Sequence, residues 1–244
     1  MSILQSVWVN VALLRPVELW HPVLGIVVYL GINQLLSGLS LDLGRCAWVK
    51  GLVVAHNCLL AVYSGWTFCT AISLLTLEDL FDVNGEAVFA APGVAGLIHL
   101  FYLSKYYEFF DTWIHYMKGR SPGFLQVYHH VGAVLIMALL VKFKVELAWF
   151  WLIFNSGVHT VMYSYYAGAT VGLRFPFKPL ITMLQMTQFV VGLSVSAWNF
   201  TYQRMTREQT AIVALNNLYV IVLLGLFLRF YDQQYRTKGG GKQS

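Results

Sequence analysis

Residues 124–130 read F-L-Q-V-Y-H-H, and the rest of the chain can be understood from this stretch. It places Gln126, His129 and His130 at the start of an apolar run, residues 131–141, that is typical of a membrane-spanning helix. In a helix, positions i, i+3 and i+4 lie within about one third of the surface. Two imidazoles and an amide are costly to hold in hydrocarbon. We therefore expect them to face a polar cavity, although a position at the membrane interface would also satisfy them.

The composition is that of an integral membrane protein. Of the 244 residues, 58% are hydrophobic and 11% are charged, whereas a soluble domain carries about a quarter charged residues. The net charge of +5 does not indicate nucleic-acid binding, because the basic residues are scattered between apolar segments. The three cysteines are isolated from one another, which argues against a disulfide framework. The lipid bilayer is therefore the first expected partner, and nucleic acid is not expected.

About 20 apolar residues are needed to cross a bilayer, and seven segments of the chain qualify. They are residues 18–38, 49–74, 90–113, 125–141, 147–167, 179–198 and 210–231. The connections are short, so we expect one domain over residues 1–244, with an N-terminal segment at 1–17 and a flexible cytosolic tail at 232–244. The predicted fold class is all-α, a polytopic membrane protein with seven transmembrane helices around a polar chamber.

The loops also predict an orientation. Lys and Arg are enriched in the loops on the side that holds the C-terminus, which places that end in the cytosol. With an odd number of spans, the N-terminus lies on the far side. The acidic residues near Asp82 then also lie on the far side, as does a glycosylation sequon at Asn199.

Charged residues interrupt the end of the third predicted span, which reads K-Y-Y-E-F-F-D-T. Lys105, Glu108 and Asp111 recur at i, i+3 and i+6, and Thr112 follows directly. They form a stripe on one helical face and can neutralise one another in part. Ionisable residues inside a membrane are functional candidates by default. The alternative is an internal ion pair that holds helices in register.

Two more polar stripes follow in the fifth and sixth spans. They comprise Asn155, His159, Tyr163 and Tyr166, and then Thr182, Gln185 and Gln188. Taken alone, each stripe would fit hydrogen bonding between helices. With the predicted orientation, however, all the polar stripes lie in the cytosolic half of the membrane. A shared depth predicts a polar chamber that is open to the cytosol.

These motifs carry a family resemblance. K-x-x-E-x-x-D-T (105–112), Q-x-x-H-H (126–130), N-S-x-x-H-x-x-M-Y-x-Y-Y (155–166) and T-x-x-Q-x-x-Q-F (182–189) occur in order. Together they resemble the ELO family of membrane fatty-acid elongases. The resemblance implies seven spans, residence in the endoplasmic reticulum, and condensation of acyl-CoA with malonyl-CoA to 3-oxoacyl-CoA, CO2 and CoA. Further partners that we consider are the reductase and dehydratase of the elongation cycle and a second copy of the chain.

The resemblance also points to a histidine nucleophile. Soluble condensing enzymes use a cysteine, but none of the three cysteines lies near the polar motifs. A neutral imidazole is nucleophilic and can leave again from an acyl-imidazole. We expect His129 to carry the acyl group and His159 to position it or transfer protons, with His130 as a further catalytic candidate. Glu108 and Asp111 would fix a tautomer or hold a proton, and Lys105 would balance their charge. No cofactor and no metal are expected.

The remaining candidates would bind the two substrates. Hydrogen bonds to the thioester and malonyl groups are assigned to Thr112, Gln126, Asn155, Tyr163, Tyr166, Gln185 and Gln188. Lys118, Arg120 and Lys178 are assigned to the CoA phosphates, although positive loops on the cytosolic side would explain them equally well. The acyl tail would enter an apolar tunnel near Leu97, Leu135, Trp151 and Val195.

Gln126 departs from the family pattern, because most members begin this motif with His. Glutamine can donate and accept hydrogen bonds but does not titrate near neutral pH. An orienting role is therefore expected. The Q-x-x-H-H form resembles the subgroup that elongates Δ9-polyunsaturated chains, which hints at the substrate.

Two other classes of protein were weighed. A membrane di-iron desaturase or hydroxylase also has clustered His motifs, but it needs about eight His ligands, and this chain has seven His in total. A seven-span receptor or transporter would explain the spans and a polar interior. It would not explain why His, Glu, Asp and Lys gather near the cytosolic face.

Overall fold

A computed structural model describes residues 16–173 and 176–236, and every regular element in these residues is helical. The elements are α2 (Trp20–Ser37), α3 (Ala47–Leu74), α4 (Leu77–Leu80), α5 (Ala87–Ala90), α6 (Val94–Tyr107), α7 (Phe109–Met117), α8 (Phe124–Lys142), α9 (Ala148–Phe150), η1 (Trp151–Asn155), α10 (Ser156–Thr170), α11 (Lys178–Tyr202), α12 (Arg207–Tyr231) and η2 (Asp232–Arg236). η1 and η2 are π-helices. The all-α prediction is confirmed for these residues.

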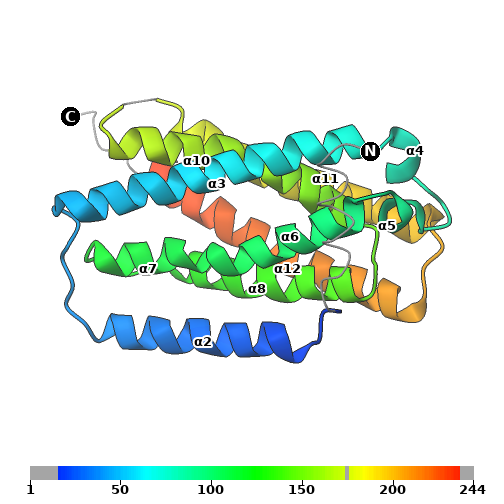
Figure 1. Ribbon diagram of the computed structural model, residues 1–244, viewed down its shortest axis with the longest axis horizontal. Coiled ribbons are helices and arrows are strands. Elements are labelled where there is room, and N and C mark those ends of the chain that lie inside the picture. Colours follow the sequence, from blue (N-terminus) through cyan, green and yellow to red (C-terminus); the bar gives the residue numbers. More distant parts are fainter. Residues whose placement is uncertain (1–15, 174–175, 237–244) are drawn as a thin grey trace.

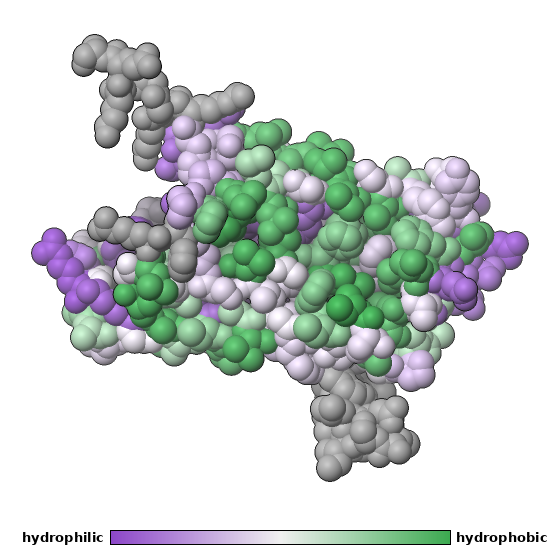
Figure 2. Space-filling model, turned by 90° about the horizontal axis from the view of Figure 1, so that it is seen from above, coloured by the Kyte–Doolittle hydropathy of each residue, from purple (hydrophilic) through white to green (hydrophobic). Residues whose placement is uncertain are grey.

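The long helices run along the long axis of the molecule (Figure 1). α3 packs on α10, α11 packs on α12, and α12 packs on α8, while α2 covers α7 and α8. Hydrophobic residues gather over the middle of the surface, and hydrophilic residues gather at its two ends (Figure 2). This banding is the surface expected of a protein that lies across a bilayer.

Four helices are long and apolar enough to cross a membrane by length and composition. They are Ala47–Leu74, Phe124–Lys142, Lys178–Tyr202 and Arg207–Tyr235. The predicted count of seven spans is therefore not confirmed. Two of the other predicted spans are interrupted: the third is divided at Glu108 into α6 and α7, and the fifth consists of α9, η1 and α10.

The two ends of the predicted domain are described only in part. Residues 1–15 of the predicted N-terminal segment and residues 237–244 of the predicted tail lie outside the described residues. Residues 232–236, also assigned to the tail, continue α12 as the π-helix η2.

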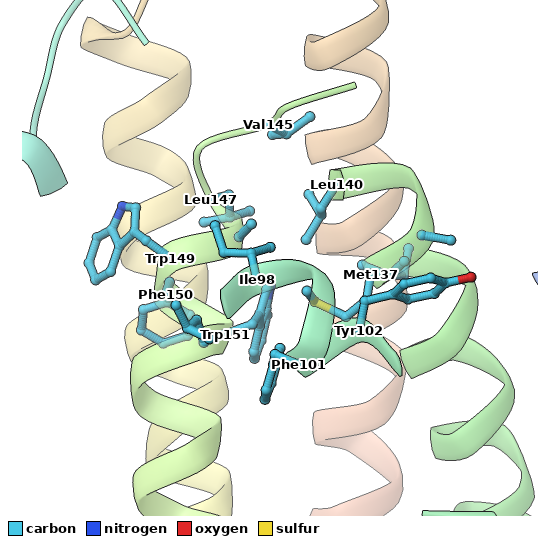
Figure 3. Close-up of a cluster of buried hydrophobic side chains, with 14 of the residues drawn as sticks. Ile98, Phe101, Tyr102, Met137, Leu140, Val145, Leu147, Trp149, Phe150 and Trp151 are labelled. Atoms are coloured by element: carbon cyan, nitrogen blue, oxygen red, sulfur yellow. The ribbon is translucent and has the colours of Figure 1, made fainter. Parts of the chain in front are cut away.

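A cluster of buried aromatic and aliphatic side chains joins the elements that carry the candidate site. Ile98, Phe101 and Tyr102 of α6 meet Met137 and Leu140 of α8 (Figure 3). Leu147, Trp149, Phe150 and Trp151 enter the same cluster from the segment before α10. Close packing of such large side chains leaves these elements little freedom to shift. The polar residues on the same helices are thereby held in place.

At the opposite end of the bundle from the HH pair, Glu146 ties together three connecting segments. Its side chain is 2% exposed. Its Oε1 accepts the Val88 N–H at 2.8 Å, and its Oε2 accepts the Gln203 Nε2–H at 3.2 Å. The Arg204 N–H donates to the Val83 carbonyl beside them at 2.8 Å. Burial removes water from the carboxylate and raises the pKa of Glu146 to about 7.

The raised pKa of Glu146 predicts a pH-dependent stability. The folded state holds this proton more tightly than the unfolded chain does. The resulting stabilisation is complete below the ordinary pKa of 4.5 and is lost as pH rises through about 7. We expect the detergent-solubilised protein to lose about 1–3 kcal/mol of stability between pH 5 and pH 8, measured as the midpoint of thermal unfolding.

Glu146→Gln should flatten this pH profile, because the amide oxygen still accepts hydrogen bonds but does not titrate. Glu208→Gln, at an exposed position on α12, is the control and should keep the wild-type profile. An unchanged slope in Glu146→Gln would show that another group is responsible.

Candidate active site

A buried ammonium group organises the polar interior. Lys105 on α6 donates from Nζ to Oε1 of Glu108 at 2.7 Å and to Oδ1 of Asn155 at 2.8 Å. Lys105 is 4% exposed and Glu108 is 2% exposed. The ammonium has donors only, so the amide of Asn155 must turn its oxygen toward Lys105. Its Nδ2 therefore faces the other way, toward His159.

The orientation of Asn155 fixes the tautomer of His159. Nδ2 of Asn155 lies 3.1 Å from Nε2 of His159, which must accept because the amide nitrogen can only donate. The ring proton of neutral His159 is then on Nδ1, and Nδ1 lies 3.6 Å from Oε1 of Glu108. Lys105, Glu108, Asn155 and His159 thus form one chain of contacts, which we call the inner network. In this network the lone pair on Nε2 of His159 already accepts a hydrogen bond from Asn155.

The two interruptions of the predicted spans coincide with the inner network. Glu108 lies where α6 gives way to α7, and Asn155 is the last residue of η1. Short π-helical turns within α-helices occur frequently at functional sites, because the extra residue redirects the side chains that follow. The local backbone thus departs from a regular helix where the polar side chains converge.

His129 reaches the same place from α8. Its Nδ1 lies 3.2 Å from the hydroxyl of Tyr219 on α12, and no hydrogen bond joins its Nε2 to another described residue. One ligand atom each from His129, Glu108 and His159 lies within 4.8 Å of the others. Four polar stripes were predicted to meet, and this is confirmed here for one residue from each of the third, fourth and fifth predicted spans.

A small cavity that is partly open to the outside lies beside His129. Its polar wall is formed by Lys105, His129, Asn155, Gln188, Asn216 and Tyr219. Its apolar wall is formed by Phe101, Ala133, Ile136, Met137, Trp151, Phe189 and Leu223. Oε1 of Gln188 is buried without a hydrogen-bond partner among the described residues, so it is available to a ligand. Of the residues predicted to line a tunnel, Trp151 lies here, whereas Leu97, Leu135 and Val195 do not.

Asp111 belongs to a second cluster and not to the inner network. Its Oδ1 lies 2.7 Å from Nε2 of His56, and its Oδ2 accepts from the hydroxyl of Tyr163 at 2.7 Å. The three residues come from α7, α3 and α10. Asp111 therefore fixes His56 and Tyr163 in place, where the sequence suggested that it would act on the catalytic His. Tyr163 is likewise engaged by Asp111 and does not line the cavity.

Three other candidates connect helices beside the cavity. Thr112 accepts from Nε2 of Gln126 at 3.2 Å and lies 2.9 Å from the hydroxyl of Tyr29. His130 points to the rings of Tyr29 and Phe109, at 6.1 and 6.2 Å between ring centroids. These side chains join α2, α7 and α8. The expected orienting role of Gln126 fits this contact, and His130 faces away from the cavity.

The remaining candidates lie outside the cavity. Tyr166 is 39% exposed, and Gln185 donates to the sulfur of Met162 at 3.2 Å. Thr182 is 5% exposed; its hydroxyl donates to the carbonyl of Lys178 at 3.4 Å and lies 3.4 Å from the hydroxyl of Tyr235. Asn199, the residue of the sequon, is 1% exposed inside α11, which disfavours glycosylation.

Lys118 and Arg120 lie in the loop after α7. Gly119 between them has φ of +67°, and a Cβ there would lie 2.9 Å from the carbonyl oxygen of Leu41. This close approach holds the loop against the α2–α3 connection, where Arg120 lines an open groove. Burial, and next the charge of Arg120, lowers the pKa of Lys118. These two basic residues are near the end of the bundle at which α8 begins.

Sequence reasoning missed Asn216 and Tyr219 on α12. Asn216 accepts from Nε1 of Trp151 at 3.1 Å and so braces the cavity wall. The available signal was an i, i+3 pair of polar residues, Asn216 and Tyr219, in one of the four helices that are apolar and long enough to cross a membrane.

Glu108, His129 and His159 are the one group of described residues arranged to hold a metal ion. The Lys105 ammonium already forms a salt bridge with the Glu108 carboxylate, 2.7 Å from Oε1, and its positive charge would repel a divalent cation. The expectation of no metal stays a prediction. The arrangement brings two His together, whereas a di-iron centre needs several more.

The chain matches the family model described as ELO, the GNS1/SUR4 family, over residues 17–243. It is 29% identical over 231 residues to "Fatty acid elongase A" of Dictyostelium discoideum, covering 89% of this chain and 85% of that protein. It is 32% identical over 232 residues to "Fatty acid elongase 4" of Trypanosoma brucei brucei, covering 93% of this chain and 88% of that protein. A third relative, "Fatty acid elongase sre1" of Dictyostelium discoideum, is 30% identical over 210 residues, covering 78% and 74%.

The Lys105–Glu108 pair predicts a large difference between single and double substitutions. Lys105→Met should destabilise the protein by about 3–5 kcal/mol, because it leaves the Glu108 carboxylate buried without a counter-charge. Adding Glu108→Gln should recover part of this loss, since the second change removes the unpaired charge. Thermal unfolding in detergent measures both effects.

The matched control is Lys142→Met. Lys142 pairs with Glu18 at 3.4 Å, and both side chains are partly exposed. Exposed pairs contribute about 0–1 kcal/mol. If Lys105→Met shifted the unfolding midpoint no more than Lys142→Met, the inner network would not depend on a buried charge pair.

Proposed function

The chain belongs to the GNS1/SUR4 family, the ELO family, and from that premise we propose that it is the condensing enzyme of fatty-acid elongation. It joins acyl-CoA with malonyl-CoA, releases CO2 and CoA, and yields 3-oxoacyl-CoA. The reaction is an acyl transfer, with His129 as the acyl carrier. Because it involves no change of redox state, we propose that it needs neither a cofactor nor a metal.

The unengaged Nε2 of His129 is the observation that carries this proposal. A nucleophile needs a free lone pair beside the site where the substrate carbonyl lies. The lone pair of His159 accepts from Asn155, and His130 faces aromatic rings outside the cavity. His129 alone among the three lines the cavity. The geometry therefore favours His129 as the nucleophile.

In the first half of the reaction, Nε2 of His129 attacks the thioester carbonyl carbon. The C–S bond breaks, CoA leaves as the thiolate, and the acylated ring carries one positive charge that Nδ1–H shares with Tyr219. The oxyanion that forms on the way needs donors. Lys105 and the amide of Gln188 are on the cavity wall to supply them.

In the second half, malonyl-CoA loses CO2, and the electron pair of the broken C–C bond remains on the adjacent carbon. This carbanion attacks the acyl carbon, and His129 leaves as neutral imidazole. The new C–C bond lengthens the chain by two carbons. A low-dielectric cavity favours decarboxylation, because it destabilises the localised charge of the carboxylate relative to the spread charge that follows.

The apolar wall of the cavity accommodates the acyl chain. We extend the proposal to Δ9-polyunsaturated chains, on the resemblance of the Q-x-x-H-H motif alone. Gln126 contacts Thr112 and does not line the cavity. It would therefore affect the choice of substrate indirectly, by fixing how α8 packs on α7. Rates on saturated and polyunsaturated acyl-CoA of equal length test this extension.

The same proposal includes the membrane arrangement. Seven spans would cross the endoplasmic reticulum membrane, with α6–α7 and α9–η1–α10 as interrupted spans, and the C-terminus in the cytosol. Lys118, Arg120 and Lys178 would then meet the CoA phosphates at the cytosolic face. A 3-oxoacyl-CoA must be reduced and dehydrated before another round, so the reductase and dehydratase of the cycle are the proposed partners. A homodimer stays a prediction.

Protease protection tests the proposed orientation. In intact microsomes, a tag placed after Lys238 should be cleaved, and a tag inserted near Asn84 should be protected until detergent is added. The reverse result would place the candidate site on the far side of the membrane, away from cytosolic CoA esters.

The acyl-histidine step predicts a half-reaction that needs no malonyl-CoA. Wild-type protein given acyl-CoA alone should release CoA in near-stoichiometric amount, and the acyl adduct should map to the peptide that carries His129. His129→Ala should lower this release by several orders of magnitude, since it removes the nucleophile.

His130→Ala is the matched control, because this neighbouring ring faces Tyr29 and Phe109. It should keep most of the CoA release. Wild-type release that begins only when malonyl-CoA is added would instead support direct attack in a ternary complex.

A further inference from the structure

We propose that Tyr219 is a positioning residue that holds the ring proton of His129 on Nδ1, and that Gly132 exists at its position to admit the Tyr219 ring. The catalytic consequence rests on the proposed function. The positioning itself rests only on contacts between α8 and α12.

The single proton of the Tyr219 hydroxyl decides the tautomer of His129. The hydroxyl donates this proton to the backbone carbonyl of His129 at 3.1 Å. The same oxygen lies 3.2 Å from Nδ1 of the His129 ring. Its proton is already used, so toward Nδ1 it can only accept. We therefore assign the ring proton of His129 to Nδ1, so that Nε2 keeps its lone pair.

Gly132 makes this contact sterically possible. It lies three residues after His129, and so on the same side of α8. A Cβ at Gly132 would overlap the Tyr219 ring, with ring atoms Cδ2 and Cζ only 2.6 and 2.7 Å away. The ring could not keep its place if α8 carried a side chain there.

Tyr128 holds the other side of the ring. Its ring stacks on that of Tyr219, with 5.5 Å between centroids and an angle of 27° between the planes. Its hydroxyl also donates to the Tyr219 carbonyl at 3.4 Å. Tyr219 thus lies in a slot on α8 formed by Tyr128 and Gly132, and the slot directs its hydroxyl to His129.

The chemical consequence concerns the nitrogen that faces the substrate. With the proton on Nε2, the ring would present an N–H to the thioester and could not attack it. With the proton on Nδ1, the lone pair of Nε2 is free, and the charge that develops on the ring is shared with Tyr219. Partners that orient a metal-bound imidazole in this way contribute roughly ten- to a hundredfold in metal affinity or activity, and we expect a similar contribution from Tyr219.

Tyr219→Phe removes the hydroxyl and keeps the ring, so it tests the proposal directly. We expect the rate of CoA release from acyl-CoA alone to fall roughly ten- to a hundredfold, with little change in the acyl-CoA concentration that gives half-maximal rate. Nitrogen NMR of ¹⁵N-histidine-labelled protein should show His129 protonated on Nδ1 in wild type and as a mixture of tautomers in Tyr219→Phe. The His129 signals are identified by their loss in His129→Ala.

Gly132→Ala tests the same contact without touching either partner. It should mimic Tyr219→Phe in both measurements. In a Tyr219→Ala background, where no ring occupies the slot, Gly132→Ala should have no further effect. The control is Gly225→Ala on α12, where a Cβ would meet nothing within 4 Å, and it should behave as wild type.

Three outcomes would overturn the proposal: wild-type CoA release by Tyr219→Phe, an additive effect of Gly132→Ala in the Tyr219→Ala background, or a wild-type His129 protonated on Nε2. The NMR measurement needs no substrate. The two measurements can also disagree. If wild type released no CoA from acyl-CoA alone, the acyl-histidine mechanism would be contradicted. The positioning role of Tyr219 would still be supported if the His129 proton were held on Nδ1 in wild type and not in Tyr219→Phe.

Discussion

The buried contact between the Lys105 ammonium and the Glu108 carboxylate sets the direction of every hydrogen bond around it. An ammonium can only donate, so the side-chain oxygen of Asn155 faces Lys105. The amide nitrogen of Asn155 then donates a hydrogen bond to Nε2 of His159. Moving this ion pair out of water is costly, and the cost is offset only while each partner keeps its contacts. The site is therefore ordered before any substrate arrives, and catalysis requires little rearrangement.

Two histidines that lie close together, His129 and His159, are held in opposite ways by their hydrogen-bond partners. His159 is held by Asn155 with its lone pair engaged, whereas His129 is held by Tyr219 through the other ring nitrogen. The difference comes from the partner of each ring and not from the rings themselves. Asp111 contacts His56 and Tyr163 instead, so this second carboxylate does not join the inner network.

The sequence was informative about which residues are polar inside an apolar chain, and less so about how the helices face one another. Spacing of three and four correctly grouped Lys105 with Glu108 and Asn155 with His159. It failed for Asp111, because the helix is interrupted at Glu108 and the i+3 spacing does not carry one face across the break. It also missed Tyr219, whose role depends on the rotation of α12 against α8 and on the absence of a side chain at Gly132. The hydrophobic periodicity of a single helix reveals neither the rotation of one helix against another nor which glycine admits a neighbouring ring.

The most direct test of the account is an experimental structure of the protein trapped after reaction with acyl-CoA in the absence of malonyl-CoA. The account predicts continuous density from Nε2 of His129 into the apolar half of the cavity, with Nδ1 still beside the Tyr219 hydroxyl and Asn155 still between Lys105 and His159. An acyl group bonded to His159 or to Nδ1 of His129, or an intact thioester with no bond to the protein, would contradict it.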